Sequence, residues 1–191
     1  FIEKVLEEAS IKKSLLSAIG ISKGPGSYTG LRIGVASAKG LAYALDIPLV
    51  SIDSLQLISR HMMSKLDNAA GKSTLFCPMI DARRMEVYCS IHDTDINTVN
   101  PIKAEIIDNS SFLNFLESST VYFGGDGSQK CKDAILSDNA KFMDNIYPSA
   151  EFMGEIINTK FLNNDVEDLA YFEPYYLKEF VTNTPKKNLL L

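Results

Sequence analysis

The segment Gly24-Pro25-Gly26-Ser27 separates an apolar run from a longer, mostly apolar segment. A glycine loop between a strand and a helix can bind phosphate through the free N–H groups of the helix N-terminus. The dinucleotide-binding pattern would need a third glycine at Thr29, and the lysine of the Walker pattern is missing. Two interpretations therefore stay open: an anion site, or a tight turn permitted by Gly24 and Gly26 and followed by Thr29 as helix cap.

A second polar cluster comprises Asp81, Arg83, Arg84 and Glu86, between two apolar segments. Its residue types would suit acid–base chemistry, but ion pairs that hold a β-hairpin are the favoured interpretation. The later segment FGGDGS likewise has two interpretations: a degenerate adenosine-binding loop, or a turn with Ser128 capping a helix.

Metal and nucleophile chemistry find little support in the residues. The two histidines, His61 and His92, are far apart and form no HxxxH pattern, and no GxSxG motif is present. The three cysteines lack CxxC spacing and are expected to be reduced thiols: Cys77, Cys89 and Cys131. The sequence thus predicts no catalytic residue, no cofactor site and no metal site.

Composition limits the class of protein. The 191 residues carry a formal net charge of -5, with 46% hydrophobic and 23% charged residues. An acidic chain is a poor candidate for holding a nucleic-acid backbone alone, because phosphate neutralisation supplies most non-specific affinity. No segment resembles a signal peptide or a membrane span, so we expect a cytoplasmic protein. Because the first residue is Phe1, we expect the sequence to begin partway into a longer protein.

Apolar periodicity predicts alternating helices and strands, which is the α/β class. Helices are expected at residues 1–10, 29–45, 54–66, 110–117 and 149–162, with another between the FGGDGS loop and about residue 136. Strands are expected at 15–22, 48–53, 101–108 and 120–124, with two more around a turn within 74–92. A boundary near residue 55 would divide a first lobe, 1–55, from a second lobe and tail, 56–191.

The predicted helix at 29–45 has few polar side chains. Its apolar seam and its ridge of small residues are spaced for helix packing: Leu31, Val35, Ala38, Ala42 and Leu45, and Gly30, Gly34 and Ala38. Glycine inside a helix costs about 1 kcal/mol relative to alanine, and this cost is best tolerated where another backbone approaches closely. We therefore expect this helix to pack on two sides. The second neighbour could be a helix of this chain or of a partner.

Four segments together resemble one family. GPGSYTGLRIGVASAKGLAYAL, IDARRMEVY, FGGDGS and FEPYYLKE occur in this order over nearly the whole chain and are similar to the motifs of the TsaB (YeaZ) family. The family's usual first strands, with a pattern like IxxI(D/E)T(S/A), are absent from this chain.

The resemblance implies an actin/hexokinase-like α/β fold of two lobes. It implies a required, non-catalytic subunit that pairs with the TsaD-like transferase and the TsaE-like ATPase. The complex would transfer a threonylcarbamoyl group to the adenosine next to the anticodon of tRNA, which the chain would meet only through the complex. The alternatives are a stand-alone glycoprotease-like hydrolase and a kinase-like, ATP-binding relative of the same fold.

The resemblance also implies a pairing surface made of the first helix and the helix after the glycine loop. The expected interface residues are Val5, Leu6, Leu31, Arg32, Gly34, Val35, Ala38, Lys39, Leu41 and Ala42. The family-motif residues are Gly24, Pro25, Gly26, Ser27, Thr29, Gly30, Asp81, Arg83 and Glu86. A homodimer through the same apolar helices is expected when the partner is absent.

Overall fold

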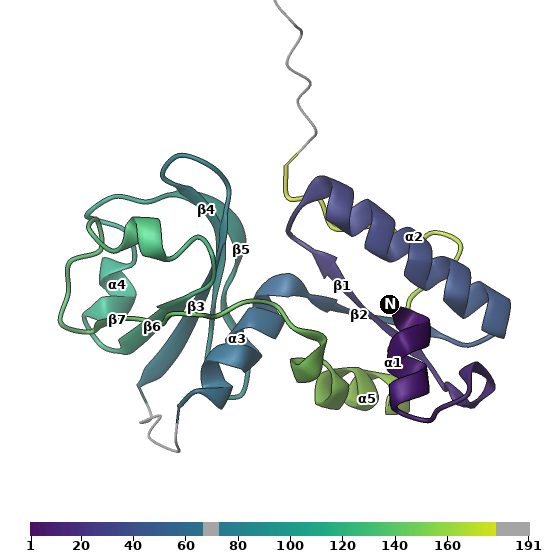
Figure 1. Cartoon of the computed structure of the whole chain (residues 1–191). Helices are drawn as coiled ribbons and strands as arrows, with labels where there is room; N and C mark the ends of the chain where they lie inside the picture. Colours follow the sequence, from purple (N-terminus) through teal and green to yellow (C-terminus); the bar gives the residue numbers. More distant parts are fainter. Residues whose placement is uncertain (67–72, 179–191) are drawn as a thin grey trace, which may run out of the picture.

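Two β-sheets divide the chain into two lobes, which lie side by side in Figure 1. The structure is a computed structural model that describes residues 1–66 and 73–178. The first lobe holds a two-stranded sheet, and the second holds a five-stranded sheet with order β5-β4-β3-β6-β7. This arrangement confirms the predicted α/β class.

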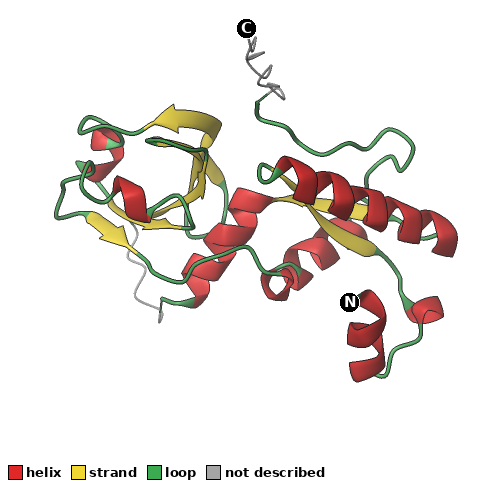
Figure 2. Cartoon of the chain, turned by 45° about the horizontal axis from the view of Figure 1, so that its top comes forward, coloured by secondary structure: helices red, strands yellow, loops and turns green. Residues whose placement is uncertain are grey.

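The first lobe is a parallel strand pair covered by helices on both faces (Figure 2). Its elements are α1 (Ile2–Glu8), the 3-10 turn η1 (Lys13–Leu15), β1 (Ile19–Gly24), α2 (Tyr28–Leu45) and β2 (Leu49–Asp53). A side chain at Gly20 would meet Ile157 of α5 (Gly154–Leu162), whereas Ile21 reaches Gly34 of α2. Because successive side chains of a strand point to opposite faces, α2 and α5 cover opposite faces of this sheet.

The second lobe is a mixed sheet. Its strands are β3 (Thr74–Asp81), β4 (Glu86–His92), β5 (Thr98–Ile106), β6 (Thr120–Gly124) and β7 (Ala140–Phe142). Strands β3, β4 and β5 are antiparallel neighbours, and β6 runs parallel to both β3 and β7. The short helix α4 (Leu113–Leu116) and the 3-10 turns η2 (Gln129–Cys131) and η3 (Ala150–Phe152) complete the elements.

Helix α3 (Ser54–Ser64) joins the lobes, and it contacts β1 and β2 as well as β3, β4 and β6. Its buried residues outnumber its exposed ones, because it is enclosed from both sides: Ser54, Leu55, Leu57, Ile58, Ser59, His61 and Met62. His61 stacks on Phe152, with ring centroids 4.5 Å apart, and its Nδ1 lies 2.9 Å from the carbonyl oxygen of Tyr147. The connection that leads back to the first lobe is thus packed against α3.

The described part of the C-terminal tail crosses the first lobe and reaches the second lobe at Lys178. Phe172 is buried with Val35, Ala38, Ala42 and Leu49 in the core of the first lobe. The backbone N–H of Tyr175 donates to the carbonyl of Lys23 at 2.7 Å, and Lys178 forms an ion pair with Glu86 of β4. Residues 154–178 therefore return to the first sheet, so the first lobe is built from two parts of the chain. The boundary near residue 55 stays a prediction of where the N-terminal part of the chain leaves the first lobe.

Most predicted elements form, with two differences. The helix expected between the FGGDGS loop and residue 136 is wrong, because only η2 and successive turns form there. Lys130 is held by Asp81 and by the carbonyl of Glu86, and these tertiary contacts fix the turns. The edge strand β7 follows and was not predicted. None of the helices in the described ranges is long and apolar enough to cross a bilayer.

Candidate interaction surface and interlobe cleft

The first glycine of the GPGS loop allows the tail to lie against the loop. Gly24 is buried with φ 122°, and a Cβ there would lie 2.5 Å from the carbonyl oxygen of Tyr175. Such a φ is rarely adopted by residues with a side chain. Gly24 is therefore required by its backbone conformation and by the close approach of the tail, and a bound phosphate is not needed to explain it.

The rest of the loop starts α2. Ser27 is the N-cap, and its Oγ accepts a hydrogen bond from the N–H of Gly30 at 3.3 Å. The cap expected at Thr29 is therefore wrong, since Thr29 already lies in the helix. A Cβ at Gly26 would meet nothing within 4 Å, and the Gly24–Pro25 bond is cis.

Helix α2 has a core-facing side and an open side. Val35, Ala38 and Ala42, three of the expected interface residues, are buried in the core of their own lobe. Leu31, Gly34 and Leu41 are half-buried. The open side is made by other residues, mostly small: Ile33, Ala36, Ser37, Gly40, Tyr43 and Ala44. Ile33 is 64% exposed, and a Cβ at Gly40 would meet nothing within 4 Å.

The two cations expected at the rim of α2 have contacts within the chain. Lys39 Nζ donates to the carbonyl oxygens of Ala170 at 3.2 Å and Phe172 at 2.8 Å, which fastens the tail to α2. Arg32 is exposed, lies 5.4 Å from the ring centroid of Tyr28 and donates to its hydroxyl at 3.3 Å.

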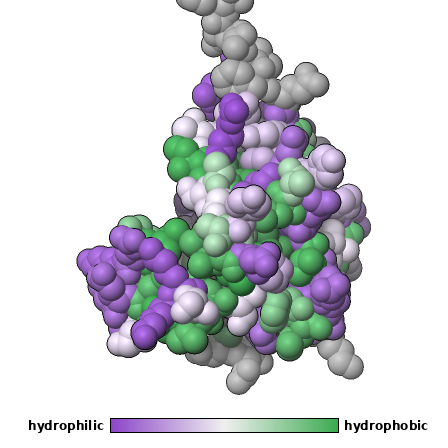
Figure 3. All heavy atoms as spheres, turned by 90° about the vertical axis from the view of Figure 1, so that its right-hand side faces the viewer, coloured by the Kyte–Doolittle hydropathy of each residue, from purple (hydrophilic) through white to green (hydrophobic). Residues whose placement is uncertain are grey.

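Helix α1 contributes exposed apolar side chains. It has no buried residue; Val5 is exposed and Leu6 is half-buried. Ile2 of the helix is also exposed, as are the large apolar residues beside it: Phe1, Ile11 and Leu15. Figure 3 shows the side of the molecule on which α1 and the C-terminal end of α2 lie. Hydrophobic patches are exposed there between polar residues. An apolar surface of this kind is typical of interaction sites.

A cavity of about 570 Å³ opens between the lobes. Its lining comes from β1, the GPGS loop, α2, α3 and residues 147–153, and it includes Ser22 and Ser54, whose hydroxyls lie 2.7 Å apart. Asp126, the charged residue of this lining, presents a carboxylate. This carboxylate accepts the backbone N–H of Asp81 at 3.0 Å, so it is held against the start of the β3–β4 hairpin.

The polar cluster at 81–86 is a hairpin turn. The backbone N–H of Arg83 donates to Asp81 Oδ1 at 2.7 Å, and Lys130 forms an ion pair with the same carboxylate. The Lys130 contact, followed by the Arg83 N–H, lowers the pKa of Asp81 below its usual value. Glu86 pairs with Lys178. These contacts agree with an ion-paired hairpin, and they leave the carboxylates occupied.

The FGGDGS loop packs tightly on β3. Gly125 has φ 108°, and a Cβ there would overlap the carbonyl oxygen of Met79. A Cβ at Gly127 would lie 2.8 Å from the carbonyl carbon of Ile80. Ser128 donates its hydroxyl to the carbonyl of Gly125 at 2.8 Å and does not cap a helix. The glycines here serve close packing.

The remaining reactive side chains are engaged in the interior. His92 is buried between two hydroxyls, with Nδ1 2.7 Å from Ser59 Oγ and Nε2 3.3 Å from Ser90 Oγ, and burial lowers its pKa to about 4. All three cysteines are buried and free, and burial raises the pKa of Cys77 and Cys131. Within residues 1–66 and 73–178, no three His, Cys, Asp or Glu side chains come together as metal ligands.

Sequence reasoning therefore missed the open side of α2. The exposed residues of α2 repeat at helical spacing, just as the buried ones do: Ile33, Ala36, Ser37 and Gly40. Periodicity therefore predicts two faces of the helix but does not show which face the rest of the lobe covers. Side-chain size does not separate the two faces either, because Ala38 and Ala42 are buried whereas Ile33 and Tyr43 are exposed.

A family model described as "TsaD: tRNA N6-adenosine threonylcarbamoyltransferase" matches residues 1–179. Two curated proteins, each named tRNA threonylcarbamoyladenosine biosynthesis protein TsaB, match nearly the whole chain. The Escherichia coli protein is 28% identical over 94% of this chain and 78% of its own length. The Haemophilus influenzae protein is 24% identical over 95% of this chain and 78% of its own length. The chain belongs to the TsaD family, within its TsaB group.

Further TsaB relatives agree with this membership. The Bacillus subtilis TsaB protein is 38% identical over 48% of this chain, and the match spans 37% of that protein. A solved structure described as YeaZ from Pseudomonas aeruginosa superposes with a TM-score of 0.78 at 20% identity, covering 92% of this chain and 81% of the other. The chain thus has the actin/hexokinase-like α/β fold, as predicted.

Proposed function

We propose that the chain is a non-catalytic subunit in the biosynthesis of threonylcarbamoyladenosine in tRNA. It pairs with a TsaD-like transferase, a TsaE-like ATPase joins the pair, and tRNA is met through the complex in the cytoplasm. The names of the E. coli and H. influenzae relatives support the pathway. The subunit role and the partners rest on the arguments that follow.

The observation that carries the proposal is the open side of α2. About three turns of this helix present Ile33, Ala36, Ser37 and Gly40 to the surface, with Tyr43 at the end of the row. Small residues along a helix let a second helix approach closely and pack its side chains into the grooves. The exposed apolar residues of α1 extend the apolar surface of the same lobe. A helical partner surface fits this face.

The non-catalytic role is supported by the engagement of the candidate side chains. His61 and His92 are both buried and hydrogen-bonded within the chain. The carboxylates of Asp81 and Glu86 pair with lysines. These contacts count against the hydrolase alternative.

The experiment mixes the full chain with the TsaD-like protein of the same organism and measures mass by size exclusion with light scattering. The variant Gly40→Gln puts a long side chain on the open face, where a Cβ meets nothing within 4 Å. The matched control is Gly154→Gln, which also meets nothing within 4 Å but lies in α5, on the other side of the first sheet. Gly34 is a poorer choice, because its Cβ position faces Ile21 of its own lobe.

We expect a stable one-to-one complex for the unchanged chain and for Gly154→Gln. Gly40→Gln should weaken association at least about tenfold, because a bulky side chain prevents close helix approach. Two separate peaks from folded, unchanged proteins would refute the proposed pairing. Equal affinity for both variants would leave the pairing but move it away from α2. The chain run alone tests the expected homodimer in the same series.

A further inference from the structure

We propose that the tip of the β3–β4 hairpin, together with a strip of basic and aromatic side chains beside it, contacts the sugar–phosphate backbone of RNA. The strip is defined as Arg83 and Arg84 of the tip, Lys178 and Tyr176 of the tail, and Tyr28 and Arg32 of α2. The inference rests on the proposed function, which brings the chain to tRNA inside a complex.

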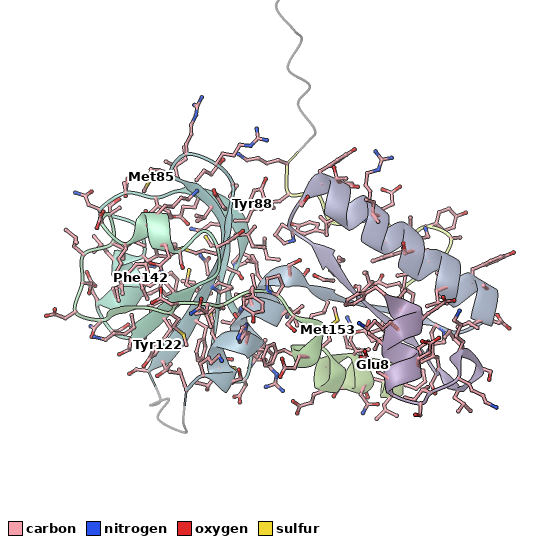
Figure 4. All side chains as sticks on the ribbon, in the orientation of Figure 1. Glu8, Met85, Tyr88, Tyr122, Phe142 and Met153 are labelled. Carbon is pink, nitrogen blue, oxygen red and sulfur yellow. The ribbon has the colours of Figure 1, made fainter. Side chains whose placement is uncertain are left out.

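The tip holds two arginines in an unusual backbone conformation. Arg83 has φ 72° and Arg84 has φ 48°, and both side chains are exposed. Residues with long side chains seldom adopt the left-handed region, which Gly and Asn enter more readily. Such strain, where it persists, often marks a functional position. Figure 4 labels the neighbouring Met85 at the upper edge of the second lobe.

The turn is held in place by hydrogen bonds. The N–H of Arg83 donates to Asp81 Oδ1 at 2.7 Å, the N–H of Glu86 donates to the carbonyl of Arg83 at 3.1 Å, and the N–H of Ala82 donates to the carbonyl of Glu86 at 3.1 Å. The two guanidinium groups are therefore presented from a defined backbone, which lowers the entropy lost on binding a ligand.

The acidic groups nearest the tip are already occupied. Asp81 pairs with Lys130, Glu86 pairs with Lys178, and Asp126 accepts the backbone N–H of Asp81 at 3.0 Å. Neither guanidinium of the tip forms an ion pair or hydrogen bond with the part of the chain that the structure describes. The tip thus carries two exposed positive charges without an acidic partner among the described residues, in a chain whose net charge is -5.

The strip continues from the tip across the tail to α2. Lys178 contacts Glu86 at the base of the hairpin, and two residues earlier Tyr176 lies against Tyr28, with ring centroids 4.8 Å apart and ring planes tilted by 31°. Arg32 in turn lies over the ring of Tyr28. Tyr176 is 37% exposed. The hairpin tip and the end of the tail lie at the same edge of the molecule in Figure 1.

This arrangement fits a polyanion better than a single carboxylate. The arginines stand at both ends of the strip, with two tyrosine rings between them, whereas one carboxylate would engage one guanidinium. Arginine combined with exposed aromatic rings is common where proteins hold nucleic-acid strands. Because the chain as a whole is acidic, the contact is weak alone and acts beside other subunits.

The test uses fluorescein-labelled tRNA whose anticodon is followed by adenosine, with binding measured by anisotropy. The variant Arg83→Asn/Arg84→Asn removes both charges, and it should keep or raise the melting temperature because asparagine tolerates the left-handed backbone. The matched control, Lys132→Gln/Lys141→Gln, removes two exposed charges from the second lobe. Each protein is measured alone at about 20 mM salt, and in the assembled complex across a salt series.

We expect the tip variant to bind tRNA about tenfold more weakly in the complex, with a salt slope of log K shallower by about two. The control should match the unchanged protein, and the isolated chain should show the same order of affinities at low salt. Unchanged tRNA affinity and slope for the tip variant would overturn the inference. Weaker assembly with unchanged tRNA binding would also overturn it, and would assign the tip to an acidic protein surface. If no complex forms, the proposed function fails, and the isolated chain still decides the RNA contact.

Discussion

The two glycine loops of the chain look alike in sequence and differ in what they precede. The loop at 24–27 leads into the 18-residue helix α2, capped by Ser27. The loop at 124–128 leads into the 3-10 turn η2, and Ser128 bonds back to Gly125. In each loop a glycine with positive φ lies against a backbone carbonyl, of Tyr175 in one and of Met79 in the other. In both loops, close packing against a backbone carbonyl is enough to explain the glycine.

The largest expected effect comes from Gly125→Ala. The loop backbone presses on the carbonyl of Met79 inside strand β3, and neither side can move without disturbing the sheet. With the unfavourable φ added, we expect a loss of about 3 kcal/mol or more in the free energy of unfolding. Urea denaturation followed by circular dichroism measures it. A loss below about 1 kcal/mol would show that this loop is not the rigid one of the two.

A pH series separates the lobes without a mutation. The buried His92 of the second lobe has a pKa of about 4, against an ordinary value of 6.5, because burial disfavours its charged form. The negative charge of the nearby Asp93 raises the pKa, but by less than burial lowers it. The unfolded chain therefore binds this proton first, and stability present above pH 6.5 is lost as the pH falls towards 4. The loss is at most about 3 kcal/mol. His92→Asn, measured over the same range, should give a flatter curve; an identical slope would contradict the assignment.

The smallest effect of the three is expected for Gly24→Ala. Its Cβ would lie 2.5 Å from the carbonyl of Tyr175, but the tail is a surface segment that can move aside. We expect a loss of about 2 kcal/mol, together with faster proteolysis of the tail. Gly26→Ala is the control, since nothing lies within 4 Å of its Cβ and its stability should stay within about 0.5 kcal/mol. Equal losses of stability in Gly24→Ala and Gly26→Ala would show that the contact between Gly24 and Tyr175 does not cause the effect.

The sequence predicts the fold best where local pattern and tertiary packing agree. Helix α2 and the hairpin at 74–92 follow from periodicity and turn chemistry. The segment after residue 128 does not, because Cys131, Ala134 and Ile135 are spaced as in a helix, whereas Lys130 is anchored to Asp81 and Glu86 across the lobe. No local pattern reveals such a distant anchor.

The candidate surface shows the same limit. Spacing identified α2 as a helix that packs on two sides, but the expected interface includes Val35, Ala38 and Ala42, which the first lobe buries. A sequence shows that a helix has two apolar faces, and the rest of the fold decides which face is buried. The face with Ala42 is covered by Phe172, which lies 130 residues away in the chain.

The tail gives the two lobes a mechanical link. They are joined by α3, by the connection that packs on His61, and by the tail, which bonds to Lys23 of one lobe and Glu86 of the other. Opening the lobes like a hinge would have to break either the ion pair at Lys178 or the backbone bond at Tyr175. The α2 surface should accordingly keep one shape before and after association. A partner then meets a preformed template, and little conformational entropy is lost in docking.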